Sequence, residues 1–486
     1  MRVLFVAAEC FPLIKTGGLA DVAGALPLAL AKLGVDVRVL LPAYPAVHDG
    51  LAEPQEVAAL PELFGGPARL VAGTAAGGLK VLALDAPHLY DRPGNPYLDA
   101  DGEDWADNDL RYAALSWVAA EIGQGRLGTW WPHLVHAHDW QAGLALAYLA
   151  FEETRPATVF TIHNLAFQGL FPAARLEALK LPEAALSVDG LEFYGQIGFL
   201  KAGLVYADGI TTVSPTYARE IQTEADGMGL DGVLRGRGDV LTGIVNGIDT
   251  EIWIPETDPA IDAPYGARRL RGKGIDKMAL QERFALDVDQ AAPLFCVVSR
   301  LTEQKGLDLL LDALPELLDC GGQLAVLGSG AGWLEDGYRA AAESHVGRVG
   351  VVIGYDEPLS HRMQAGADAI LVPSRFEPCG LTQLCGLRYG TLPVVARVGG
   401  LADTVIDAND AALRDGVATG FQFAPVTAEA LGFAIRRACA LYADRRRWQA
   451  MQRRAMSREV GWAAPAADYL ALYRSLAPAP AAALAS

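Results

Sequence analysis

A short loop near the start of the chain carries residue types that could bind an anionic ligand. The loop Lys15-Thr16-Gly17-Gly18 separates an apolar strand candidate, residues 2–8, from a helical pattern over residues 19–33. N–H groups at a helix start attract negative charge, and residues without Cβ let a ligand approach the main chain closely. Because Lys15 adds a mobile cation, the loop predicts a cradle for phosphate or sugar hydroxyls, unless the glycines only form a tight turn beside a solvated lysine.

The sequence Gly-Gly-Leu-Ala-Asp recurs in the second half of the chain, at Gly399–Asp403, again after an apolar run. We interpret both copies as cradles of the same kind. Two such units in the two halves favour two similarly built α/β domains that face a common ligand, although so short an echo could arise by chance.

Two cations and a carboxylate in the second half could act on a sugar diphosphate. Arg300 and Lys305 follow a strand candidate directly, and such cations suit a departing diphosphate on which negative charge grows. Glu377 lies just before the turn Pro378–Gly380, where it could accept sugar hydroxyls while the next helix start faces phosphate. The simpler alternatives are two exposed cations and a carboxylate that caps a helix.

Three histidines follow strand candidates in the first half: His136, His138 and His163. No third ligand for a metal is obvious beside the first two, so the pattern predicts no zinc site. We interpret His163 as a hydrogen-bonding group at a strand end and Asp139 as a contact for a bound hydroxyl. Tyr97 could stack on a sugar, although aromatic residues more often lie in the core.

Apolar runs alternate with helical patterns along almost the whole chain, which predicts two doubly wound parallel sheets. A length of 486 residues also suits two domains. Ligands of such sheets bind at the carboxyl ends of the strands. The predicted parts are a first domain (1–253), a second domain (254–457), a last helix (458–476) and a disordered Pro-Ala tail (477–486).

Composition excludes several classes of function. A net charge of -18 opposes non-specific binding to nucleic acid, because no excess of cations can replace the phosphate counterions. We expect neither a signal peptide nor a membrane span, since the N-terminal apolar run is short and no run approaches about 18 residues. A cytoplasmic location is the simplest inference. The six cysteines form no Cys-x-x-Cys pair, so neither a disulfide framework nor a structural metal is indicated.

Eight blocks together resemble the family of bacterial glycogen synthases and plant starch synthases, in the same order and from Met1 to about Tyr473. The blocks are Lys15–Asp21, His136–Trp140, Thr161–Asn164, Val213–Ile221, Asn246–Asp249, Ser299–Gly306, Pro373–Leu384 and Val398–Val405. The resemblance implies a GT-B fold, in which two Rossmann-like domains face each other across a deep cleft and the C-terminal helix crosses back to the first domain.

The resemblance also implies an activity: retaining transfer of glucose from ADP-glucose to the non-reducing 4-hydroxyl of an α-1,4-glucan such as glycogen or a maltooligosaccharide. The family needs no metal and no cofactor, and a front-face mechanism is expected. Carried over by motif, the catalytic residues would be Lys15, His163, Arg300, Lys305 and Glu377. The substrate-binding residues would be Gly18, Asp21, Tyr97, Asp139, Asn164, Asn246, Gly354, Tyr355, Cys379, Gly380, Leu381 and Thr382.

Cys385 occupies the place where related enzymes often carry a second Glu, so a scheme with two carboxylates is unsupported. The alternatives are a transferase for a small acceptor, a glucan phosphorylase that would need pyridoxal phosphate on a lysine, and a non-catalytic glucan-binding protein. The oligomeric state and the strength of the preference for ADP-glucose over UDP-glucose stay open.

Overall fold

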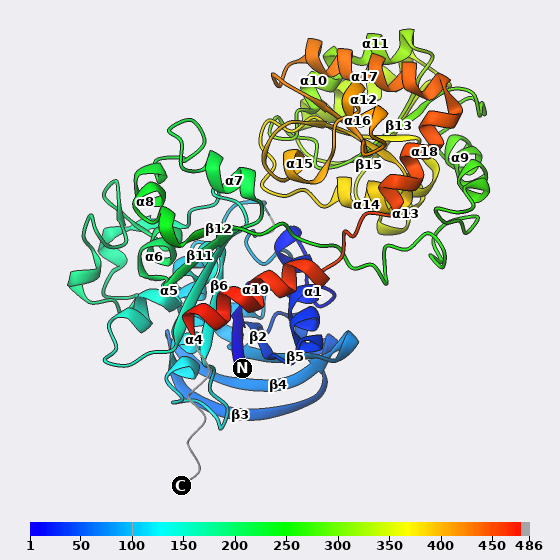
Figure 1. The fold of residues 1–486 in the computed structure, drawn as a ribbon. Helices are drawn as coiled ribbons and strands as arrows, with labels where there is room; N and C mark the ends of the chain where they lie inside the picture. Colours follow the sequence, from blue (N-terminus) through cyan, green and yellow to red (C-terminus); the bar gives the residue numbers. More distant parts are fainter. Residues whose placement is uncertain (100, 478–486) are drawn as a thin grey trace. The chain divides into compact units, whose positions relative to one another are not determined.

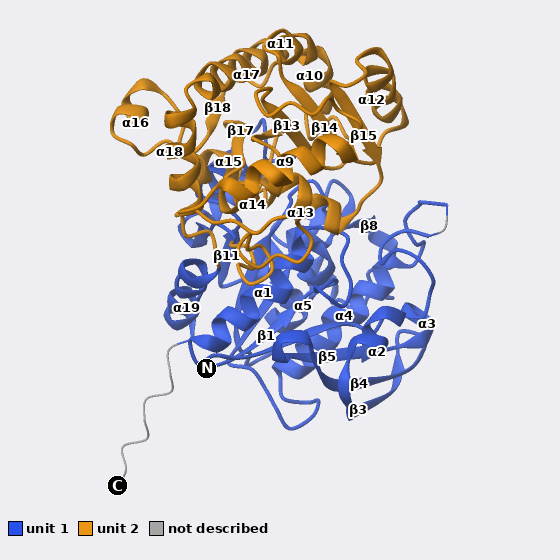
Figure 2. Ribbon diagram, turned by 90° about the vertical axis from the view of Figure 1, so that its right-hand side faces the viewer, with its two compact units in different colours: residues 1–246, 462–486 blue, residues 247–461 orange. Residues whose placement is uncertain are grey.

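The computed structural model describes residues 1–99 and 101–477 and divides into two compact units. Unit 1 comprises Met1–Asn246 together with the C-terminal segment from Trp462, and unit 2 comprises Gly247–Gly461 (Figure 2). The boundaries predicted from the sequence fall after residues 253 and 457. The expected tail, 477–486, lies outside the described residues except for its first member.

Unit 1 contains a nine-stranded sheet in the order β12-β11-β7-β6-β1-β2-β5-β4-β3 (Figure 1). All neighbours from β12 to β5 pair in parallel, whereas β4 and β3 add antiparallel strands at one edge. The strands are β1 (Arg2–Val6), β2 (Asp36–Pro42), β3 (Ala52–Leu63), β4 (Gly66–Ala75), β5 (Leu79–Asp85), β6 (Leu134–His138), β7 (Ala157–Ile162), β11 (Gly209–Thr212) and β12 (Leu241–Gly243).

Most of the parallel strands were expected because they are apolar runs that the sheet buries on both faces, as in β1 and β7. The antiparallel pair β3 and β4 was not predicted, since most of β3 is exposed and its sequence contains three Glu and two prolines. A smaller sheet, also not predicted, has the order β8-β10-β9. Its strands are β8 (Leu170–Pro172), β9 (Glu192–Phe193) and β10 (Gln196–Gly198).

The last helix, α19 (Ala463–Leu476), belongs to unit 1, as the predicted fold requires. Its Tyr473 hydroxyl lies 2.7 Å from Nδ1 of His136 on β6, and α19 also packs beside α1 (Figure 1). The other helices of unit 1 are α1 (Gly18–Lys32), α2 (Pro45–Gly50), α3 (Pro87–Tyr90), α4 (Asn108–Gly123), α5 (Asp139–Ala150), α6 (Phe199–Tyr206), α7 (Pro215–Glu220) and α8 (Asp231–Gly236).

Unit 2 is built on a six-stranded parallel sheet in the order β15-β14-β13-β16-β17-β18. Apolar side chains of these strands and of the surrounding helices form its main core clusters. The strands are β13 (Leu294–Val298), β14 (Gln323–Gly328), β15 (Val349–Ile353), β16 (Ala369–Val372), β17 (Leu392–Ala396) and β18 (Phe421–Phe423). The helices are α9 (Arg271–Arg283), α10 (Leu307–Asp312), α11 (Leu314–Asp319), α12 (Gly332–Ser344), α13 (Glu357–Gly366), α14 (Thr382–Tyr389), α15 (Gly399–Thr404), α16 (Asp410–Arg414), α17 (Ala428–Ala443) and α18 (Arg445–Met456).

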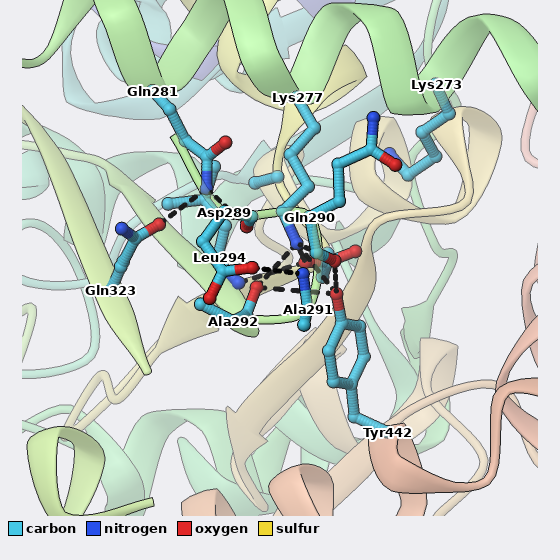
Figure 3. Close-up of polar contacts among 12 residues, drawn as sticks. Lys273, Lys277, Gln281, Asp289, Gln290, Ala291, Ala292, Leu294, Gln323 and Tyr442 are labelled. Carbon is cyan, nitrogen blue, oxygen red and sulfur yellow. Dashed lines mark hydrogen bonds and ion pairs between the residues drawn. The ribbon is translucent and has the colours of Figure 1, made fainter. Parts of the chain in front are cut away.

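A buried lysine fastens α9 to the amino-terminal edge of this sheet (Figure 3). Nζ of Lys277 donates to the Ala292 carbonyl at 2.5 Å, to Oδ2 of Asp368 at 2.7 Å and to the Tyr442 hydroxyl at 2.7 Å. The same carboxylate oxygen accepts the N–H of Leu294 at the start of β13. Because ligands of parallel sheets bind at the opposite edge, we assign this network a structural role.

No helix within residues 1–99 and 101–477 is both long enough and apolar enough to cross a lipid bilayer.

Candidate functional site

Both sheets have a point at which the chain reverses its direction of strand addition, and several of the predicted site residues lie on the loops beside these points. In unit 1 the reversal lies between β1 and β6, and in unit 2 it lies between β13 and β16. Loops that leave the sheet in opposite directions open a crevice there, which is where open α/β sheets bind ligands. The donor site shared between the two units stays a prediction.

The Lys15 loop forms the start of α1, as expected. Nζ of Lys15 lies 2.8 Å from Oδ1 of Asp21, on the first turn of the helix. A Cβ added at Gly17 would meet no atom within 4 Å, so packing within the protein does not require glycine at this position. The N–H of Gly18, the first residue of α1, has no intrahelical acceptor. These features leave room for an anion beside the main chain.

Glu9, which in the sequence only ends an apolar run, organises this loop. Its Oε2 accepts the N–H groups of Thr16 at 2.5 Å and Gly17 at 3.2 Å, and its Oε1 accepts the Thr16 hydroxyl at 2.7 Å. The Tyr97 hydroxyl donates to the same Oε1 at 2.7 Å. Glu9 is only 3% exposed, so one buried carboxylate ties the Lys15 loop to the residue expected near the acceptor.

Asp139 and His163 lie at the ends of the neighbouring strands β6 and β7 and contact each other. Oδ1 of Asp139 accepts the main-chain N–H of His163 at 2.7 Å, and Asp139 itself has a positive φ of 54°. Burial raises the pKa of Asp139 to about 7, although the N–H groups of His163 and Asn164 oppose the shift. Asp139 therefore holds the His163 segment in place, a role the sequence did not indicate.

Burial lowers the pKa of His163 to about 3, so its imidazole is neutral near pH 7. Its Nε2 lies 3.0 Å from Nδ1 of His138, and burial also holds the pKa values of His136 and His138 well below the usual range. Within residues 1–99 and 101–477, no group of three or more His, Cys, Asp and Glu side chains could hold a metal ion. The histidines form a row of neutral rings inside the sheet.

The amides at two further predicted positions in unit 1 have different environments. The side chain of Asn164 closes a turn, since its Oδ1 accepts the N–H of Ala166 at 3.0 Å. Asn246 is buried, and its Oδ1 has no hydrogen-bond partner among the described residues. A buried acceptor without a donor is costly, so Asn246 is suited to accept a bond from a ligand hydroxyl.

In unit 2 the structure brings together Lys305 and Glu377, which lie on the loops after β13 and β16. Nζ of Lys305 lies 2.6 Å from Oε2 of Glu377, and the Ser374 hydroxyl donates to the same oxygen at 2.8 Å. Glu377 is 7% exposed, whereas Arg300, on the Lys305 loop, is exposed. The site thus has a fixed ion pair at the reversal point and a second cation free to approach a ligand from solvent.

The turn after Glu377 is held by side-chain and main-chain contacts. Nε2 of Gln383 donates to the carbonyls of Cys379 at 3.0 Å and Gly380 at 2.8 Å, and Gly380 has a φ of 73° that favours glycine. Leu381 then caps α14, which begins at Thr382. The helix start predicted at this loop is therefore present. Cys385, one turn further, is buried in the core of unit 2.

The second Gly-Gly copy has a structural explanation that is not visible in the sequence. A Cβ at Gly399 would lie 2.0 Å from the Glu377 carbonyl oxygen, and one at Gly400 would lie 2.3 Å from the Cys379 carbonyl oxygen. The N–H of Gly400 donates to the Glu377 carbonyl at 3.1 Å. Close backbone packing accounts for both glycines, so this copy supports the Glu377 loop, whereas the sequence alone predicts a ligand cradle.

Gly354 and Tyr355 follow β15 at the same edge of the sheet. Gly354 has a φ of 130°, and its N–H donates to the Gly328 carbonyl at 3.0 Å. The Tyr355 ring is 65% exposed, and its hydroxyl contacts the Glu357 carboxylate. An exposed aromatic face at the carboxyl edge can stack on a flat ligand such as a nucleobase.

Two Rossmann-like units with cations, a buried carboxylate and helix starts at their ligand-binding edges define a two-domain glycosyltransferase. Residues 2–236 match the family described as the starch synthase catalytic domain, and residues 279–455 match glycosyl transferases group 1. The chain belongs to the glycogen and starch synthase family.

Individual relatives agree with this assignment. The chain is 59% identical over 477 residues to a glycogen synthase of Rhodopseudomonas palustris, covering 98% of this chain and 99% of that protein. A glycogen synthase of Roseobacter denitrificans is 58% identical over the same length and coverage. Among solved structures, the catalytic domain of starch synthase IV from Arabidopsis thaliana, bound to ADP and acarbose, is similar with a TM-score of 0.87 and 30% identity, covering 98% of this chain and 99% of that chain. A sucrose-phosphate synthase from Thermosynechococcus elongatus shares the fold, with a TM-score of 0.60 at 19% identity and 98% of each chain covered.

Proposed function

We propose that this glycosyltransferase elongates glycogen by transferring glucose from ADP-glucose to the non-reducing 4-hydroxyl of an α-1,4-glucan. The high identity to glycogen synthases over the full length supports the reaction, and the ADP and acarbose bound to the plant relative support the two substrate classes. A cytoplasmic location, which we inferred from the sequence, is part of this proposal.

The ion pair of Lys305 and Glu377 carries the proposal. A carboxylate that is already held by Lys305 and Ser374 keeps a fixed position, so it can accept hydroxyl hydrogen bonds from the glucosyl group without reorganising. Lys305 and the exposed Arg300 would meet the diphosphate, where negative charge grows as the bond to glucose breaks. One pair of loops thus provides contacts for both halves of the donor.

In unit 1, Lys15 and the N–H groups at the start of α1 would bind the same diphosphate, and His163 would lie beside the glucosyl group. Because the His163 imidazole is neutral, it can form hydrogen bonds to the sugar without adding a positive charge that would draw the departing diphosphate away from Lys305 and Arg300. Asn246 and Asn164 would bind sugar hydroxyls. We infer that Asp139 positions the His163 segment, since its carboxylate is engaged by main-chain N–H groups.

We propose a front-face substitution that retains the anomeric configuration and needs no metal. The bond between glucose C1 and the phosphate oxygen breaks, and C1 bonds to the acceptor 4-oxygen on the same face. The proton of the acceptor hydroxyl passes to the departing phosphate oxygen, and ADP leaves. No protein nucleophile takes part in this scheme. Related enzymes often carry a second Glu at the position of Cys385, and here that position holds a buried cysteine, so no second carboxylate is present there.

The test is a transfer assay with radiolabelled ADP-glucose and maltotriose or glycogen. We expect the Lys305→Ala variant to lose at least about 10² in kcat, the loss typical when one charge-stabilising donor is removed from an active site. Lys80→Ala is the matched control, because Lys80 forms a 2.7 Å ion pair with Asp36 on the outside of unit 1. Unchanged turnover in Lys305→Ala would contradict the proposed role.

The same assay distinguishes the alternatives. UDP-glucose tests the nucleotide preference, and glucose 1-phosphate with added pyridoxal phosphate tests a phosphorylase. Analysis of the product by proton NMR reports the anomeric configuration, and a chelator such as EDTA tests the independence from metal. Absence of transfer from every donor would contradict the enzyme assignment.

A further inference from the structure

Two cysteines of unit 2 lie next to each other on neighbouring helices. Cys320 caps the C-terminal end of α11, and Cys439 lies one turn before the end of α17. Both are free thiols and both are partly exposed, and we call them the thiol pair. The other cysteines of the chain, all within the described residues, are buried: Cys10, Cys296, Cys379 and Cys385.

The packing of α11 on α17 brings the thiol pair together. Figure 1 and Figure 2 both show the two helices side by side. One turn before Cys320, Oε1 of Glu316 lies 3.8 Å from a guanidinium nitrogen of Arg436, and its Cγ would lie 3.1 Å from a Cβ added at Gly432. Residues three or four apart share one face of a helix, so Cys320 follows Glu316 and Cys439 follows Arg436 along the same contact. Helix packing therefore sets the position of both thiols.

The two thiols also interact directly. Burial raises the pKa of Cys439, and the charge of Cys320 and a hydrogen bond with the Cys320 thiol raise it further. Such a hydrogen bond requires the two side chains to face each other. A disulfide forms without movement of the backbone only where two cysteines are already close and directed toward each other, so the thiol pair meets this condition.

The surroundings distinguish the two members of the thiol pair. A thiolate, not a thiol, attacks other sulfur atoms, and a cation beside a cysteine favours the thiolate. The Arg348 guanidinium donates to the carbonyls of Leu318 at 3.0 Å and Gly322 at 2.6 Å, on either side of Cys320. Cys439 stays protonated at neutral pH because its pKa is raised. Cys320 is therefore the sulfur that attacks first.

The thiol pair lies at the edge of the unit 2 sheet opposite the predicted donor loops. From Cys320 the chain passes through two glycines into the start of β14 at Gln323, which is the amino-terminal edge of the parallel sheet. Lys305 and Glu377 lie on loops that follow strands, at the carboxyl edge. A bond between the two sulfur atoms would therefore fasten α11 to α17 without touching the predicted site.

We propose that the thiol pair is a reversible oxidation site, at which a low-molecular-weight disulfide such as oxidised glutathione converts Cys320 and Cys439 into a disulfide. The Cys320 thiolate attacks one glutathione sulfur, the glutathione S–S bond breaks, and one glutathione leaves as its thiolate. The Cys439 sulfur loses its proton and attacks the Cys320 sulfur of this mixed disulfide, which releases the second glutathione. The protein gives up two electrons and two protons, and both protons end on the glutathione thiols.

The new bond should stabilise unit 2 and leave its chemistry intact. It closes the long loop of chain from Cys320 to Cys439, which lowers the entropy of the unfolded chain. In a reducing compartment the two thiols stay free, and an oxidising glutathione pool forms the bond. The inference goes beyond the proposed function, because it does not depend on the identity of the donor or the acceptor.

The test equilibrates the full-length protein in glutathione buffers that range from fully reduced to fully oxidised. Free thiols are then blocked with N-ethylmaleimide, and the protein is studied by intact mass and by peptide mapping without reduction. Cys320→Ser and Cys439→Ser remove the site. Cys296→Ala is the matched control from the same unit, since burial raises the pKa of the Cys296 thiol to about 12 and makes it unreactive.

We expect oxidation to remove two free thiols and to yield one linked peptide that contains Cys320 and Cys439. The linked peptide should persist in Cys296→Ala and be absent from both serine variants. The melting temperature of the oxidised protein should exceed that of the reduced protein by about 5 °C or more, and this difference should vanish in the serine variants. Dithiothreitol should restore both thiols and the lower melting temperature.

Several results would overturn the proposal. They are free thiols at Cys320 and Cys439 at every glutathione ratio, separate glutathione adducts on the two cysteines, or a bond between two copies of the chain. A linked peptide with an unchanged melting temperature would refute the stabilising role. Transfer of glucose should continue at the same kcat after oxidation, and a loss that both serine variants prevent would contradict the separation of the thiol pair from the predicted site.

Discussion

The role of Glu9 can be tested by removing its carboxylate. In the structure this side chain accepts four hydrogen bonds: two from main-chain N–H groups, of Thr16 and Gly17, and two from the hydroxyls of Thr16 and Tyr97. The Glu9→Ala variant leaves all four donors without their acceptor. The Glu9→Gln variant keeps the shape, and its amide oxygen can still face the two N–H groups, while the hydroxyls can accept from its NH₂ group.

The contacts set the size of the expected effect. A hydrogen bond to a charged group contributes about 1.5–3 kcal/mol, and water that enters the space left by the Glu9 side chain can replace part of the lost bonding, so we take about 3 kcal/mol for the whole loop. That loss corresponds to roughly 10²-fold in the fraction of molecules that hold the Lys15 loop in its binding geometry. Neutral hydrogen bonds are about half as strong as charge-assisted ones, so Glu9→Gln should lose roughly tenfold.

The assay is the initial rate at saturating glycogen with varied ADP-glucose. We expect kcat/KM for the donor to fall in the order unchanged protein, Glu9→Gln, Glu9→Ala. Glu62→Ala is the control, since its carboxylate also accepts a main-chain N–H, of Gly65 at 2.9 Å, but in the exposed hairpin of β3 and β4. A Glu9→Ala enzyme within twofold of the unchanged protein would show that other contacts order the loop.

Three further predictions concern packing, buried charge and acid stability. Gly399→Ala should lower kcat by about tenfold or more without unfolding the chain, because strain of about 1–3 kcal/mol falls on the Glu377 loop; an unchanged kcat at an unchanged melting temperature would contradict this. Lys277→Met should lower the free energy of unfolding of unit 2 by about 3–5 kcal/mol in urea, because it leaves the Asp368 carboxylate buried without its cation. An unchanged midpoint of urea unfolding would refute this prediction. Acidification from pH 7 to pH 5 should lower the hydrogen-exchange protection factors of β6 and β7 more than those of β13 and β14, because the opened segment binds protons at His163 and the two other buried histidines, whereas the closed segment does not. Equal changes in the protection factors of the two sheets would refute the reasoning.

The sign of the acid effect follows from the pKa shifts. A histidine whose folded pKa lies near 3, below its unfolded value of about 6.5, stabilises fully above the unfolded pKa and loses this contribution as the pH falls. The pKa of Asp139 is raised to about 7, so its contribution is present in acid and lost as the pH rises through 7. The two effects oppose each other between about pH 4 and 6.5, and the three histidines outweigh the single carboxylate.

The sequence predicts the parallel sheets well because buried parallel strands are continuous apolar runs. Strands β14 (Gln323–Gly328) and β15 (Val349–Ile353) are runs of this kind. The antiparallel edge of unit 1 lacks such runs, since β3 is mostly exposed. Apolar and polar residues alternate along a strand only where one face of the sheet is buried. Neither face of β3 is fully buried, so its sequence does not show the alternation that would predict a strand.

The candidate site shows the same division between local and distant information. The Lys15 loop, the Lys305 loop and the Glu377 turn were found because each motif lies between a strand and a helix. The function of Glu9 depends on Tyr97, which lies 88 residues away, so no local pattern could indicate it. The glycines at 399 and 400 look like a ligand loop in sequence, but the close approach of the Glu377 loop became visible only in the folded chain.

The return of α19 to unit 1 determines the order in which a newly made chain can finish folding. Multidomain proteins usually fold from the N-terminus during synthesis. Here Tyr473 completes the buried surroundings of His136. Unit 1 therefore starts to fold first but completes its folding last, after the contiguous segment Gly247–Gly461 has left the ribosome. A nascent chain that stalls before Trp462 would therefore expose part of its first core, which makes that intermediate a natural client for chaperones.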